Sequence, residues 1–121
     1  MKVKTYRDLK VWQRGMDLAK LIYRETASMP KAEMFGLTSQ MRRAATSIPM
    51  NIAEGFGKHT RPELLRGLRL ATGSLFELMT AWELTVSLEL LKPCPEIIAS
   101  MAELDRMVSA MIKKLEAKPR A

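Results

Sequence analysis

The feature that most constrains this chain is a helical pattern over residues 38–57 with a proline in its middle. Pro49 removes a backbone hydrogen-bond donor and crowds the carbonyl group four residues earlier, so this helix is an unusual one. Small residues flank its polar side, which favours close packing against a second helix. Apolar side chains still recur every three to four positions and predict a buried face: Leu37, Met41, Ala44, Ala45, Ile48 and Ile52.

A line of polar residues shares one face of the same segment, since its members are spaced by four, four and three positions. These residues are Arg43, Ser47, Asn51 and Glu54. One interpretation is a stripe that faces water. The other is a polar seam inside a bundle, where the line meets Ser74 and Glu77 of a later helix. In that case we expect Glu77 to pair with Arg43 or to accept a hydrogen bond from Asn51.

Apolar periodicity predicts an all-α chain with one domain over residues 1–121. We expect helices at about residues 6–28, 38–57, 61–91 and 96–117. Pro30 ends the first helix, and Pro93 and Pro95 separate the third from the fourth. Thr38 or Ser39 is expected to cap the second helix, and Thr60 with Glu63 fits a capping box for the third.

Specific side chains of these helices have predicted places in the core. The apolar stripe of the first helix is expected to run through Leu9, Trp12, Met16, Ala19, Ile22 and Tyr23, with Trp12 as a core anchor. Phe35 and Leu37 are expected to tuck under the end of the bundle. Gly67 and Gly73 lower helix propensity, which suggests that a neighbouring helix approaches there.

The fourth helix carries two apolar edges rather than one. A strict four-three rhythm connects Ile97, Met101, Leu104, Val108, Met111 and Leu115. Ile98, Met107 and Ile112 add a second edge, which is either part of a broad core stripe or a surface buried against another subunit.

Net charge is +7 and is unevenly distributed along the chain. Residues 1–31 are strongly basic, whereas residues 73–95 hold three acidic groups and one basic group. This asymmetry favours a polyanionic partner, although a solubility role explains the same charge. The candidate phosphate-contacting residues are Lys10, Arg14, Lys20 and Arg24 on the first helix and Lys113, Lys114, Lys118 and Arg120 in the C-terminal segment. Lys2 and Lys4 are expected to assist, and Arg66 and Arg69 are weaker candidates.

Several function classes lack their sequence signatures. A single cysteine, Cys94, and a single histidine, His59, make no plausible metal set, so we expect no metal and no cofactor. Glu54 and Glu77 might be taken for an acid–base or metal pair, but no Glu-x-x-His accompanies them. Phosphate-binding loops and nucleophile elbows are also missing, so no catalytic residue is predicted. The N-terminus does not resemble a signal peptide and no run can span a membrane, which predicts a cytoplasmic protein.

The segment SQMRRAATSIPMNIAEGFG resembles the signature of a four-helix-bundle family encoded in intervening sequences of bacterial 23S ribosomal RNA genes. The segments YRDLKVWQRGMDLAKLIY, FGLTSQ and LATGSLFELMTAWELTVSLELL are similar to the same family and follow in its order, over about residues 6–91. The resemblance implies an up-down-up-down antiparallel four-helix bundle, often assembled as a ring of five, with no known enzyme activity. A distant relative of the family is the accessory protein of diversity-generating retroelements, a basic ring that works with a reverse transcriptase and RNA.

Two hypotheses about function follow from these observations. The first is a non-enzymatic homo-oligomer that binds RNA, or DNA, through backbone phosphates. The second is an adaptor whose partner is a protein such as a reverse transcriptase, bound through the acidic and apolar surface of residues 73–91.

Overall fold

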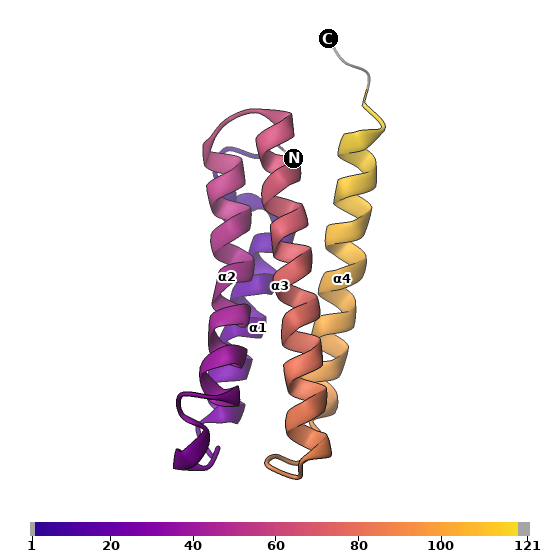
Figure 1. Cartoon of the computed structure of the whole chain (residues 1–121). Helices are drawn as coiled ribbons and strands as arrows, with labels where there is room; N and C mark the ends of the chain where they lie inside the picture. Colours follow the sequence, from indigo (N-terminus) through magenta and orange to yellow (C-terminus); the bar gives the residue numbers. More distant parts are fainter. Residues whose placement is uncertain (1, 119–121) are drawn as a thin grey trace.

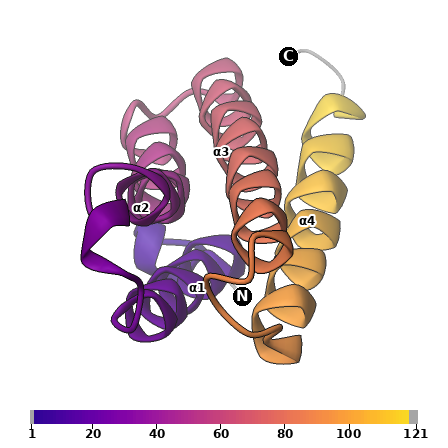
Figure 2. The same cartoon turned by 60° about the horizontal axis from the view of Figure 1, so that its bottom comes forward.

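The computed structural model of the protein describes residues 2–118 and consists, over that range, of four α-helices and two short 3-10 helices (Figure 1). The α-helices are α1 (Lys10–Thr26), α2 (Leu37–Gly57), α3 (Arg61–Ser87) and α4 (Pro95–Glu116). The 3-10 helices η1 (Tyr6–Asp8) and η2 (Lys31–Glu33) precede α1 and α2. The helices lie side by side with successive connections at opposite ends, which makes an antiparallel bundle (Figures 1 and 2). The predicted all-α class is thereby confirmed.

The helix boundaries differ from the predicted ones where local backbone chemistry decides them. Residues 6–8 form a separate 3-10 turn, capped by Thr5 and Asp8, and α1 begins only at Lys10. The Asp8 carboxylate accepts hydrogen bonds from the backbone N–H groups of Lys4 and Thr5, which lower the pKa of Asp8. At the other end of the chain, α3 stops at Ser87 because Glu89 has a φ of 60°, a left-handed conformation that a helix does not continue through.

The cap of α2 also differs from the prediction. Gly36, not Thr38 or Ser39, occupies the N-cap position. The Glu33 carboxylate reaches forward instead and accepts a hydrogen bond of 3.2 Å from the backbone N–H of Leu37. Thr38 is buried, and its hydroxyl has no hydrogen-bond partner within residues 2–118. By contrast, Thr60 caps α3 as expected, with its hydroxyl accepting from the N–H of Glu63.

Helix α2 continues through Pro49, which is buried against α1. A Cβ atom built on Gly15 of α1 would lie 3.4 Å from Ile48 Cγ2 and 3.5 Å from Pro49 Cδ. Gly15 therefore lets α1 pack directly on the proline ring, and this contact supports the irregular part of α2.

Two glycines bring α2 and α3 into backbone contact. A Cβ atom on Gly55 would lie 2.8 Å from the carbonyl oxygen of Glu63 and 3.1 Å from Gly67 Cα. On Gly67 it would lie 2.5 Å from the carbonyl oxygen of Asn51. The predicted close approach at Gly67 is thus confirmed. The same prediction for Gly73 is wrong, because Gly73 is exposed and its added Cβ would meet no atom within 4 Å.

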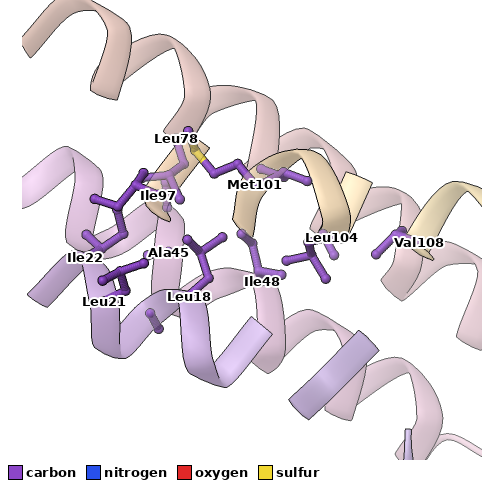
Figure 3. Close-up of a cluster of buried hydrophobic side chains, with 14 of the residues drawn as sticks. Leu18, Leu21, Ile22, Ala45, Ile48, Leu78, Ile97, Met101, Leu104 and Val108 are labelled. Atoms are coloured by element: carbon purple, nitrogen blue, oxygen red, sulfur yellow. The ribbon is translucent and has the colours of Figure 1, made fainter. Parts of the chain in front are cut away.

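The core is a continuous cluster from all four helices, and Figure 3 shows the part where α1, α2, α3 and α4 meet. The predicted core residues of α4 are confirmed, since Ile97, Met101, Leu104 and Val108 are all buried. The predicted stripe of α1 is only partly right. Its core face runs through Val11, Leu18, Leu21 and Ile22 together with Ala19.

Trp12 and Tyr23 leave the core as a consequence. Trp12 is half-buried and packs edge-on against Tyr6, with ring centroids 5.1 Å apart. Tyr23 is 46% exposed, and the Arg42 guanidinium lies 4.5 Å from its ring centroid. The expected role of Trp12 as a core anchor is therefore wrong, because α1 turns this edge toward an open groove beside α2.

The connection between α1 and α2 departs most from its prediction. Leu37 packs against the core as expected. Phe35, however, is 94% exposed and Met34 is 54% exposed, so neither tucks under the bundle.

The two α3 glycines give a matched stability test. Gly67→Ala should lower the free energy of unfolding by about 3 kcal/mol, because the new methyl group meets backbone atoms that cannot move aside. Gly73→Ala should raise it by about 0.5 to 1 kcal/mol, since an exposed helical glycine gains propensity without a clash. Urea unfolding followed by circular dichroism, at one protein concentration, measures both. Equal effects of the two substitutions would contradict the close α2–α3 contact.

Candidate nucleic-acid and assembly surfaces

Three lysines converge on a groove of about 570 Å³ between the first part of α1 and the last part of α4. The lysine groove, as we call it, has Lys10 on one side and Lys114 and Lys118 on the other. Its floor is apolar and includes Val11, Met107 and Met111, and the residues that line it include no carboxylate. Long lysine side chains lay their methylene groups on such a floor and keep their ammonium groups in water.

The arginines predicted to share this role are placed differently. Arg14 donates to Glu103 of α4 at 2.9 Å, and Arg24 donates to Glu96 of α4 at 2.9 Å and to Glu25 at 3.0 Å. The hydrogen bond from Glu96 is the main cause of a raised pKa for Arg24. Arg69 of α3 pairs with Glu116 in the same way. These cations are already neutralised by a neighbour, although the pairs are exposed and each contributes little stability.

The other predicted phosphate contacts are more scattered. Lys20 is exposed on the outer side of α1, and Lys113 is exposed on α4 but does not line the lysine groove. Lys118 lies within reach of a further cation, since its carbonyl oxygen accepts a hydrogen bond of 3.2 Å from Arg61. Arg120 lies outside the described residues.

The polar line of α2 meets α3 at a single point. The hydroxyl groups of Ser47 and Ser74 share a hydrogen bond of 2.6 Å, and the Asn51 side chain donates to the carbonyl oxygen of Ser47 at 2.8 Å. The predicted contact with Ser74 is thus observed. The predicted role of Glu77 is not, because Glu77 is exposed and the hydrogen bonds of residues 2–118 join it neither to Arg43 nor to Asn51.

Arg43 and Glu54 are exposed as well. The expected buried network is therefore a small serine–serine contact with one asparagine beside it. The reason is geometric, because Arg43 and Glu54 project from the outer ridge of α2 while Ser47 and Asn51 project toward α3.

Two further grooves are apolar and lie on opposite sides of the bundle. The α1–α2 groove, of about 640 Å³, is lined mainly by apolar side chains such as Trp12, Met16 and Met50. The α3–α4 groove, of about 480 Å³, is lined by residues that include Met79, Val86 and Ile98. The only sequence signal for either groove was the second apolar edge of α4, to which Ile98 belongs.

Sites for metals or membranes are not found in the part of the chain that the structure describes. Across residues 2–118, His, Cys, Asp and Glu side chains form no group of three or more that can hold a metal ion. Within the same range, no helix combines the length and apolar character needed to cross a bilayer. His59, with a φ of 63°, is exposed in the turn between α2 and α3.

The arrangement defines a basic antiparallel four-helix bundle with one lysine-lined groove and two apolar grooves. A family profile described as 23S rRNA-intervening sequence protein matches residues 7–114. The chain therefore belongs to the family of 23S rRNA intervening sequence proteins.

A solved structure supports the same fold. It is a protein of unknown function from the S23 ribosomal protein family of Bacteroides thetaiotaomicron VPI-5482, with 22% sequence identity and a TM-score of 0.77. The match covers 85% of this chain and 95% of that one. Comparison with curated proteins finds no match.

The α2–α3 polar contact can be separated from the surface by mutation. Ser74→Ala should lower the free energy of unfolding by about 1 kcal/mol, because it leaves the Ser47 hydroxyl without that partner. Glu77→Gln should change it by less than about 0.5 kcal/mol, as expected for an exposed side chain. Thermal or urea unfolding of both variants measures this difference. A large loss for Glu77→Gln would restore the buried pair that the sequence suggested.

Proposed function

We propose that this protein is a non-enzymatic, homo-oligomeric bundle that binds nucleic acid, RNA in preference to DNA, through backbone phosphates at the lysine groove. The observation that carries the proposal is the contrast between its two sets of cations. Lys10, Lys114 and Lys118 share a groove whose lining includes no carboxylate, whereas Arg14, Arg24 and Arg69 each face a glutamate.

This contrast matters because phosphate binding depends on cations that are free to replace counterions. A lysine without a nearby carboxylate keeps its full attraction for a polyanion, and an apolar floor restricts where its ammonium group lies. Such contacts position a nucleic acid without reading its sequence. The preference for RNA is suggested by the family, whose members are described as 23S rRNA-intervening sequence proteins.

Self-assembly is supported by the apolar surface that the single chain leaves open. Tyr23 and Met50 on the α1–α2 side are 46% and 66% exposed, and Leu84, Leu88 and Ile98 on the α3–α4 side are 47%, 56% and 53% exposed. Two different apolar sides on one chain favour a head-to-tail contact, which closes into a ring when the rotation permits. A ring of five would gather a formal charge of +35 (5 × 7) on one particle.

One surface favours a second candidate, an adaptor for a protein partner such as a reverse transcriptase. Exposed Phe76, Leu84 and Leu88 lie on α3 and the residue after it, beside exposed Glu77 and Glu83. An acidic and apolar strip of this kind fits a protein better than a nucleic acid. Binding that survives nuclease treatment and high salt would favour this candidate.

The proposal is tested with two triple variants that remove the same charge. Lys10→Gln, Lys114→Gln and Lys118→Gln together should weaken binding of a structured RNA, because each lost phosphate contact lowers the salt slope of log affinity by about one unit. The control is Arg14→Gln, Arg24→Gln and Arg69→Gln, which also reduces net charge from +7 to +4 (7 − 3). Fluorescence anisotropy across a salt series measures both, with duplex DNA in parallel.

Each outcome decides one part of the proposal. A reduced slope for the lysine variant alone supports the lysine groove. Equal losses in the two variants would mean that net charge, rather than this groove, attracts RNA. Absence of binding by the unmodified protein at low salt would reject the nucleic-acid function.

A further inference from the structure

We propose that Phe35 of one copy inserts into the α3–α4 groove of the next copy and so fixes the head-to-tail contact. This inference rests on the proposed self-assembly and names the two surfaces that make it. Phe35 has the largest exposed fraction among the exposed large apolar residues, at 94%, and Met34 beside it is 54% exposed. An aromatic side chain offers about 150 to 250 Å² for burial, so leaving one in water is costly.

The segment that carries Phe35 is held in place rather than loose. Backbone hydrogen bonds join Glu33 to Pro30, Met34 to Lys31 and Gly36 to Glu33. The Glu33 carboxylate also accepts from the N–H of Leu37 at the start of α2. An exposed aromatic on such a pre-organised turn loses little conformational freedom when it binds.

The α3–α4 groove has the chemistry to receive an aromatic side chain. Its lining includes Met79, Met101 and Ile98, and methionine thioethers make favourable contacts with aromatic rings. Its volume of about 480 Å³ falls within the range of small-molecule pockets and leaves room for Phe35 together with Met34.

Charge favours this pairing over pairing of like surfaces. Glu83 lines the α3–α4 groove, whereas exposed Lys31 lies four residues before Phe35. Two α3–α4 grooves facing each other would bring Glu83 near its own copy, and the same holds for Lys31 in two facing connections. Complementary charges at the rim select the partner even where they add little affinity.

Position along the bundle also fits a ring. The α1–α2 connection (dark purple) and the α3–α4 connection (orange) lie at the same end of the molecule but on different sides (Figures 1 and 2). The groove is formed by the last part of α3 and the first part of α4, which meet at that end. Knob and groove are therefore at the same level, so a head-to-tail contact can repeat by rotation around an axis along the helices.

The test uses one variant of each surface and their mixture. Phe35→Ser removes the knob, and Ile98→Glu places a charge in the groove; both positions are exposed, so folding should persist and circular dichroism checks it. Val3→Ser, at another exposed apolar residue, is the control. Native mass spectrometry and light scattering give the mass of each. Each single variant should weaken self-association by more than about 30-fold, as for an interface hot spot, and the control should not.

The mixture distinguishes this contact from other ways to assemble. Phe35→Ser keeps a groove and Ile98→Glu keeps a knob, so an equimolar mixture should form a one-to-one pair of twice 13.7 kDa that grows no further. Wild-type mass for Phe35→Ser, or a mixture that stays monomeric, would overturn the inference while leaving self-assembly intact. A monomeric unmodified protein would instead reject the proposed self-assembly itself.

Discussion

The close contact between α2 and α3 is the constraint on which the rest of the structure depends. At Gly55 and Gly67 the two backbones are so near that no side chain fits between them. This contact fixes the relative position of the two helices, and the Ser47–Ser74 hydrogen bond lies on the same interface. Pro49 then becomes tolerable, because α1 packs on its ring through Gly15 on the other side of α2. Helix α4 completes the core through Ile97, Leu104 and Val108.

That packing also decides where charge and apolar surface are left over. Ion pairs cross from α1 to α4 at Arg14 and Arg24, but they do not extend to the end where Lys10 faces Lys114. One end of this interface is thus neutralised and the other stays basic. On the two neighbouring sides, small and medium side chains leave apolar grooves rather than a closed surface. A single chain therefore leaves both charge and apolar area unsatisfied, which is typical of a subunit with a polyanionic partner.

The sequence was enough to predict four helices, the heptad core of α4 and the close approach at Gly67, because each depends on local periodicity or on one residue type. It was not enough to place Trp12 and Tyr23, since α1 has apolar residues on two adjacent edges and only the packing of α4 selects between them. The partners of Arg14 and Arg24 lie 89 and 72 residues away, beyond any local pattern. Phe35 was misplaced because an apolar residue in a short connection usually turns inward, and here Glu33 holds the turn outward.

The central claim is that the lysine groove, not the overall charge, meets the nucleic acid. The most direct measurement is lysine acetylation of the whole protein, read residue by residue with mass spectrometry, with and without a bound structured RNA at low salt. The account predicts that RNA protects Lys10, Lys114 and Lys118, while Lys31 and Lys92 at the opposite end keep the reactivity they have without RNA. Uniform protection of all these lysines, or protection of Lys31 and Lys92 alone, would contradict it.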